Sequence, residues 1–189
     1  MNNNTIFTFK ELLANKSLIN KETLKVGNFA RNISYAISVG KLLHLRRSIY
    51  SRDHNYSKLE LATKIYKPAY ISFETVLQSE GIIFQNYTSI TVATYKTLNI
   101  ICDKNKIRFR KLKDDVLYNS LGIINVGNYH VASKERAMLD LLYLNKKYFF
   151  DNLREIDWSS LKKMSKIYNS KSLEDEVAKL YKNYTKNND

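Results

Sequence analysis

Over the first quarter of the chain, the pattern of apolar and polar positions predicts three short helices and then a hairpin. Thr8 can cap a first helix, "FKELLANK", whose apolar residues share one face. Asn20 can cap a second helix, "KETLK", and a third is expected over residues 28–39, where Gly40 can end it in the left-handed conformation. The next stretch, "GKLLHLRRSIYSR" (40–52), alternates as strand, turn and strand. Elements in this order are typical of a winged helix-turn-helix.

The third predicted helix has one apolar face and one face without acids. On a helical projection its apolar residues cluster on one side, namely Phe29, Ile33, Ala36 and Ile37. The opposite side and its flank carry hydrogen-bonding residues and one cation, namely Asn28, Arg31, Asn32, Tyr35 and Ser38. An ordinary solvated helix face mixes Glu with Lys, whereas a face with donors and no acid suits the negative major groove. We therefore expect this face to contact DNA.

The hairpin after this helix is basic, and two interpretations of it are open. As a wing, it would approach the DNA backbone or the minor groove through Lys41, His44, Arg46 and Arg47. As a plain surface hairpin, its Arg-Arg pair would serve only solubility, which is common at turns. Its place directly after an acid-free helix face favours the wing.

Beyond residue 52 the pattern predicts helices mixed with antiparallel hairpins. Helices are expected at "SKLELATKIYK" (57–67), "FETVLQSE" (73–80, capped by Ser72), "KERAMLDLLYL" (134–144, capped by Ser133), "SSLKKMSKIYN" (159–169, behind Asp157) and "LEDEVAKLYKNY" (173–184, behind Ser172). Strands are expected at "GIIF" (81–84), "SITVAT" (89–94), "LNIIC" (98–102), "KIRFRKL" (106–112), "GIINV" (122–126) and "YHVA" (129–132). We expect an α+β fold, with a winged helix-turn-helix over residues 1–52 and a mixed α/β domain with antiparallel hairpins over residues 53–189.

The charge of the chain strengthens the DNA-binding interpretation. The formal net charge is +13 and the sequence pI is about 9.6, which suggests a polyanion as partner, either nucleic acid or an anionic membrane surface. The first 52 residues hold nine Lys or Arg against two Glu, a net charge of +7, while the remaining 137 residues carry +6. An AT-rich genome would favour Lys throughout the chain, and such a bias alone does not predict this concentration of charge in the first quarter.

The sequence shows no pattern of catalytic or metal-binding residues. Cys102 is the only cysteine, so no disulfide within the chain is possible, and this favours a reducing compartment. There is no signal-peptide pattern and no run of 18 apolar residues, so we expect a cytoplasmic protein without a membrane partner. His44, His54 and His130 form no zinc-binding pair, and phosphate-binding and nucleophile motifs are absent. We expect no metal, no cofactor and no enzymatic activity, and an enzyme acting on RNA or nucleotides is the least favoured class.

Two segments of the second part carry motifs, "KPAYISFETVLQSEGII" (67–83) and "HVASKERAMLDLLYL" (130–144). Through Tyr70, Ser72, Glu74, Leu77 and Gly81 in the first, and Ala132, Ser133, Glu135, Arg136, Ala137 and Asp140 in the second, the chain resembles the AbiEi family of antitoxins from abortive-infection, type IV toxin–antitoxin systems. Lys134 stands where the family often has Pro, and "RSIY" stands where many members have a Gly-x-Tyr wing. Nothing from about residue 157 onward matches a family motif.

The resemblance implies a function that spacing alone does not. Members repress their own operon by binding inverted repeats in double-stranded DNA through the winged helix, and they neutralise a nucleotidyltransferase-type toxin through the C-terminal domain. The alternative is a protein-interaction module that binds a partner directly, with DNA binding secondary or lost. Within the motifs, Ser72 and Ser133 are expected to cap helices. Asp140, inside an apolar helix, is expected to bond Tyr70 or Arg136, or else to face a toxin-related surface.

Overall fold

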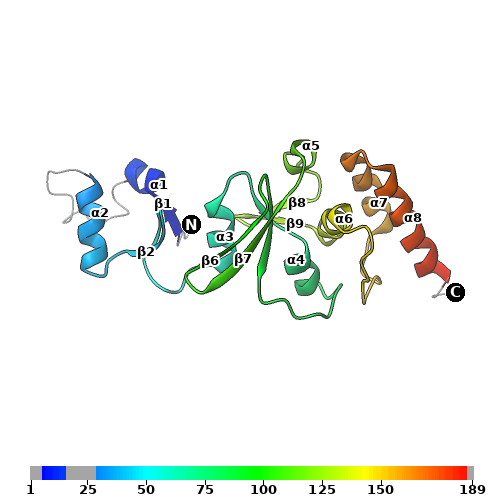
Figure 1. The fold of residues 1–189 in the computed structure, drawn as a ribbon, viewed down its shortest axis with the longest axis horizontal. Helices are drawn as coiled ribbons and strands as arrows, with labels where there is room; N and C mark the ends of the chain where they lie inside the picture. The colour runs from blue at the N-terminus through cyan, green and yellow to red at the C-terminus, as the bar shows by residue number, and fades with distance from the viewer. Residues whose placement is uncertain (1–5, 16–28, 187–189) are drawn as a thin grey trace.

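A computed structural model describes residues 6–15 and 29–186, and these residues form a mixed α+β fold. Its N-terminal elements lie at one end of an elongated molecule, followed by a six-stranded sheet and then by a layer of helices (Figure 1). The N-terminal elements are β1 (Ile6–Thr8), α1 (Phe9–Ala14), α2 (Phe29–Ser38), β2 (Leu43–Arg46) and β3 (Ile49–Ser51). The strands form an antiparallel sheet in the order β1-β3-β2.

The first and third predicted helices and the hairpin are confirmed, whereas the winged helix-turn-helix as a whole stays a prediction. Thr8 caps α1 in a capping box, since its side chain accepts from the Glu11 amide and the Glu11 carboxylate accepts from the Thr8 amide. The third predicted helix is α2, and Gly40 follows it with a φ of +71°. The hairpin β2–β3 is present, but β1, which pairs with β3, was not predicted. The predicted helix "KETLK" and its cap Asn20 lie outside the described residues.

The N-terminal sheet buries both of its faces. Phe7 and Tyr50 are cross-strand partners, and they pack with Leu12, Ile33, Ala36 and Leu42 in a small hydrophobic cluster under α1 and α2. Ile6 and Ile49 point to the opposite face and belong to the large core of the rest of the chain. This division follows from the two-residue period of a strand, in which neighbouring side chains point to opposite faces.

The larger sheet has the strand order β6-β7-β5-β4-β9-β8. Its strands are β4 (Tyr70–Ile71), β5 (Ile90–Thr94), β6 (Leu98–Cys102), β7 (Asn105–Lys111), β8 (Ile123–Asn125) and β9 (His130–Ala132). The two predicted hairpins, β6–β7 and β8–β9, are confirmed as antiparallel pairs. The sheet also contains parallel pairs, β5 with β7 and β4 with β9, which were not predicted. The predicted strand at residues 81–84 is wrong, because Ile82 and Ile83 lie buried in a loop whose Ile82 carbonyl accepts from the amides of Asp151 and Asn152.

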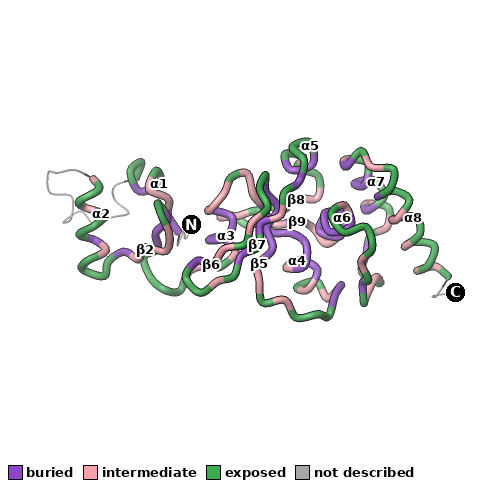
Figure 2. The backbone as a smooth tube through the Cα atoms, in the orientation of Figure 1, coloured by how far each residue is buried: buried purple, intermediate pink, exposed green. Residues whose placement is uncertain are grey.

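Helices surround this sheet and complete the core. They are α3 (Lys58–Ile65), α4 (Glu74–Ser79), α5 (Asp114–Leu117), α6 (Lys134–Leu144), α7 (Trp158–Ser165), a 3-10 turn (Lys166–Tyr168) and α8 (Lys171–Lys186). Helix α6 is the most buried of them and lies between the sheet and the pair α7 and α8 (Figures 1 and 2). No helix in residues 6–15 or 29–186 is both long and apolar enough to cross a membrane.

Of the two caps predicted in this part, Ser133 is confirmed and Ser72 is wrong, and of the residues expected before the last two helices, Asp157 caps its helix and Ser172 does not. The side chains of Ser133 and Asp157 accept hydrogen bonds from the first-turn amides of α6 and α7. Ser72 does not cap α4, because the residue before the helix is Phe73, whose φ is +58°. Ser72 is buried, and its hydroxyl donates to Asp140 instead. Ser172 lies inside α8, whose first turn instead donates to Ser170.

Candidate nucleic-acid interface

Helix α2 has the amphipathic arrangement that the sequence predicts. Ile33 and Ala36 are buried, and Phe29 and Ile37 pack against the same cluster. The Phe29 ring meets the Phe9 ring of α1 edge to face, with centroids 5.3 Å apart. These contacts fix which side of α2 faces outward.

The outward side of α2 is polar and carries no acid. Arg31, Tyr35 and Ser38 are exposed, with Tyr35 at 57%, and Asn32 is half-buried on the flank. The Ser38 hydroxyl donates to the Tyr35 carbonyl over 2.9 Å, so it is already engaged within the helix. Asn28 lies outside the described residues. Arg31 and Tyr35 therefore offer the freest hydrogen-bonding groups on this face.

The two arginines of the hairpin are neighbours in sequence, but their side chains lie in different environments. Arg47 is exposed at the turn, next to Ser48 with a φ of +61°. Arg46 is half-buried and pairs across the sheet with Ile49, so it shares the face that turns toward the large core. Arg46 lies close enough to Cys102 for its charge to act on the thiol: burial raises the pKa of Cys102, and the charge of Arg46 opposes that rise. Arg47 is consequently the better placed of the two to meet a polyanion.

The other hairpin residues remain on the surface. Lys41 and His44 are exposed, and the His44 ring packs on the Tyr50 ring with centroids 5.3 Å apart, as cross-strand partners. Arg52, which the sequence interpretation did not select, is exposed directly after β3, and its guanidinium lies 5.4 Å from the centroid of the Phe7 ring. Its position in the same basic stretch is the signal that could have identified it.

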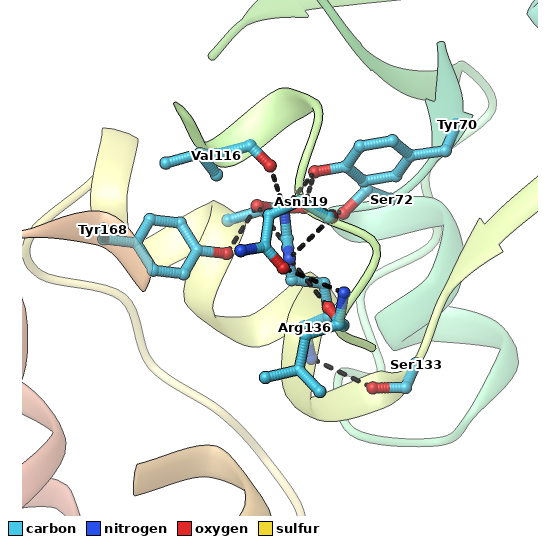
Figure 3. A network of polar contacts seen from close by, with 9 residues as sticks. Tyr70, Ser72, Val116, Asn119, Ser133, Arg136 and Tyr168 are labelled. Atoms are coloured by element: carbon cyan, nitrogen blue, oxygen red, sulfur yellow. Dashed lines mark hydrogen bonds and ion pairs between the residues drawn. The ribbon is translucent and has the colours of Figure 1, made fainter. Parts of the chain in front are cut away.

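The motif residues of the second part do not form a surface site, because they meet in a buried polar network (Figure 3). Asp140 of α6 is fully buried and accepts hydrogen bonds from Tyr70, Ser72 and Tyr168 over 3.0, 2.7 and 2.6 Å. Arg136 Nε lies 3.3 Å from Asp140 Oδ1. Asp140 therefore bonds both partners expected from the sequence and does not face a surface, and Ser72 donates to it instead of capping a helix.

Arg136 joins this network to the segment around α5. Its guanidinium donates to the carbonyls of Val116 and Leu121 over 2.6 and 2.8 Å and to the Tyr70 hydroxyl over 3.1 Å. Burial raises the pKa of Asp140, while the charge of Arg136 and the three hydroxyl donors lower it. Burial raises the pKa of Tyr70 and Tyr168 well above their ordinary value, and the charge of Asp140 raises it further, so both stay protonated donors. The network thus holds β4, α5, α6 and the 3-10 turn together.

The remaining motif acids also have partners within the fold. Glu74 forms an ion pair with Arg110, with Oε1 3.3 Å from Nη1, and Glu135 accepts from the Asp157 amide over 3.3 Å. Among the described residues, no three His, Cys, Asp or Glu side chains gather where they could hold a metal ion. Comparison of the sequence with known protein-family models and with curated proteins found no match.

Proposed function

We propose that this chain is a DNA-binding transcriptional autoregulator and antitoxin, and that its N-terminal elements act as a winged helix-turn-helix. The observation that carries the proposal is the exposed, acid-free face of α2, which precedes a basic hairpin in the most basic quarter of the chain. A face of this composition is attracted to the negative potential of the DNA major groove, and it has no carboxylate to repel the phosphates.

The side chains divide into two roles in this proposal. Arg31 and Tyr35 enter the major groove and contact base edges, helped by Asn32 and Ser38 and by Asn28, which lies outside the described residues. Lys41, His44, Arg46 and Arg47 approach the backbone or the minor groove through the hairpin, and Arg47 contributes more than Arg46 because only Arg47 of that pair is exposed. Sequence preference then belongs to α2, and most of the salt-dependent affinity belongs to the hairpin.

The antitoxin role rests on the resemblance of the two motifs, at residues 67–83 and 130–144, to those of the AbiEi family. Their residues build the buried network around Asp140 and the ion pair of Glu74, so the motifs specify the fold of the second part. In the proposal, the second part neutralises a nucleotidyltransferase-type toxin, without the need for a stable complex with it. Co-expression with the adjacent gene tests this role. Expression of that gene alone should arrest growth of the host cells, and growth should recover only when this chain is also expressed.

Binding to the DNA upstream of the chain's own coding region tests the DNA-binding role. Mobility shifts at low salt should show a complex with the upstream duplex that survives competition by unrelated duplex. If the protein shifts neither duplex at low salt, the proposal is wrong, because non-specific electrostatic binding is strongest under those conditions.

One observation favours a protein-interaction module as the second candidate function. Phe84 and Phe149 are 72% and 80% exposed, on two loops joined by a 2.7 Å hydrogen bond from the Phe84 amide to the Asp151 carboxylate. Exposed aromatic side chains on adjoining loops are typical of protein-binding surfaces. A pull-down with the purified product of the adjacent gene, compared between the wild type and Phe84→Ser/Phe149→Ser, separates this function from DNA binding.

A further inference from the structure

A buried lysine joins the N-terminal elements to α3. The side chain of Lys64, near the end of α3, is 5% exposed. Its ammonium donates to the Ile6 carbonyl of β1 and lies 3.2 Å from Glu11 Oε2 of α1. A buried ammonium is costly unless it is paired. The contacts of Lys64 are therefore directional, and they are complete only when β1 and α1 sit on α3 as observed.

A second carboxylate extends this arrangement to the larger sheet. Glu60, one turn earlier on α3, places Oε1 3.2 Å from the Lys64 ammonium. Glu60 Oε2 accepts a hydrogen bond from the Asn128 side chain over 3.3 Å, in the turn between β8 and β9. Lys64 is thus anchored on the side of the large core as well as on the N-terminal side.

Glu11 connects Lys64 to α2. The same oxygen that faces Lys64 accepts the Thr8 amide over 2.7 Å in the capping box of α1. Leu12, the next residue, lies in the small cluster that holds Ile33 of α2. Lys64 is therefore connected to the candidate recognition helix α2 indirectly, through its contact with Glu11 of α1, and it does not lie at the proposed DNA surface.

Apart from a weak 3.5 Å hydrogen bond from the Cys102 thiol to the Leu45 carbonyl, the rest of the joint is mostly apolar and less directional. Ile6 and Ile49 lie in the large core, and Leu45 packs against it. Hydrophobic contact is non-directional, so it holds two segments together without selecting one angle between them. Hydrogen bonds to a buried charge can supply the missing specificity, as buried polar groups do at other helical interfaces.

We propose that Lys64 is a positioning residue that fixes the orientation of β1, α1 and α2 relative to the rest of the chain. The consequence for DNA binding rests on the proposed function, whereas the fixed orientation does not. A protein that binds two half-sites must present its recognition helices at the half-site spacing, so a single orientation raises the share of molecules that are competent to bind.

Distances between two spin labels test the orientation without DNA. Labels are placed at Lys10→Cys in α1 and Asp115→Cys in α5, both exposed, and Cys102 stays in place because it is buried. The wild type should give one narrow distance distribution. Lys64→Met should broaden it at temperatures well below the midpoint of thermal unfolding, and that midpoint should itself fall, because Glu60 is left buried without its cation. Lys64→Arg should restore the narrow distribution.

A narrow distribution in folded Lys64→Met, measured well below its unfolding midpoint, would overturn the proposal. If Lys64→Met does not fold, Glu11→Gln provides the measurement, with broadening expected and an unchanged distribution contradicting the proposal. In DNA titrations, Lys64→Met should weaken binding about fivefold if about one molecule in five keeps the competent orientation, with the salt slope unchanged. If the wild type binds no DNA, the proposed function fails, and the label distances alone decide the role of Lys64.

Discussion

Arg136 and Asp140 lie one turn apart on α6 with both side chains fully buried, and Arg136 Nε donates to Asp140 Oδ1 over 3.3 Å. Tyr70 contacts both of them, since its hydroxyl donates to Asp140 and accepts from Arg136. The pair therefore acts as a shared attachment point for elements that are distant in sequence. This explains why both segments with family-like motifs contribute to one buried network.

Breaking this pair from one side should destabilise the fold strongly. Arg136→Met leaves Asp140 buried without its cation, and we expect a loss of about 3–5 kcal/mol in the free energy of unfolding. Tyr168→Phe removes a single donor to the same carboxylate and should cost less, about 1–3 kcal/mol. Urea unfolding followed by circular dichroism measures both. Equal stability of Arg136→Met and the wild type would show that the network contributes nothing.

The close packing of Gly122 gives a second stability test. Its φ is +76°, and a Cβ there would come within 2.6 Å of Met164 Sδ and 2.9 Å of Arg136 Cβ. Gly81 has a similar φ of +66° but open space around it, so Gly81→Ala isolates the backbone cost of about 1–2 kcal/mol. Gly122→Ala should lose a further 1–3 kcal/mol or so from overpacking. Equal losses in the two variants would contradict the packing described around Arg136.

The salt bridge of Glu11 predicts a pH dependence in acid. Burial raises the pKa of Glu11, but the Thr8 amide and the charge of Lys64 outweigh it, and the pKa lies below the ordinary value of 4.5. The folded state thus has the lower pKa, so its contribution to stability is present above pH 4.5 and is lost as the pH falls through the folded value. Glu11→Gln should flatten the stability profile in this window relative to the wild type. Identical slopes in unfolding experiments between pH 5 and 3 would argue against the ion pair.

The two proposed groups of DNA contacts should respond differently to substitution. Arg47→Ala removes about one phosphate contact, so the slope of log affinity against log salt should fall by about 0.9 for every DNA sequence. Arg31→Ala should instead cost about 1–3 kcal/mol on the preferred sequence and relax discrimination among operator variants. Fluorescence anisotropy with the upstream duplex and single-base variants measures both. Loss of discrimination in Arg47→Ala alone would reverse the assigned roles.

Local features of this fold could be predicted from the sequence because they depend on neighbours in the chain. The caps at Thr8, Ser133 and Asp157 and the hairpins β6–β7 and β8–β9 each follow from a few adjacent residues. The β1–β3 pairing and the parallel pairs of the larger sheet join distant segments, and no local pattern specifies them. Ser72 failed as a cap because Asp140, far along the chain, takes its hydroxyl.

The candidate interface shows the same limit. The exposed and buried faces of α2 follow from helical periodicity, and the structure reproduces them. The two arginines of the hairpin look equivalent in sequence, yet the turn leaves Arg47 exposed while Arg46 points with Ile49 toward the large core. Which face of the hairpin becomes covered depends on the large core that Ile49 joins and on Cys102 of β6, which contacts Leu45, and the sequence of the hairpin contains no information about either.

The most direct test of the proposed function compares DNA binding by two double variants that lose equal charge. Arg31→Ala/Arg47→Ala removes two exposed cations from α2 and the hairpin, and Lys162→Ala/Lys163→Ala removes two exposed cations from α7, at the other end of the molecule (Figure 1). In anisotropy titrations of the upstream duplex across a range of salt, the first variant should lose most of its affinity and about two units of salt slope, while the second should match the wild type. Equal affinities of the two variants would contradict the assignment of DNA binding to α2 and the hairpin.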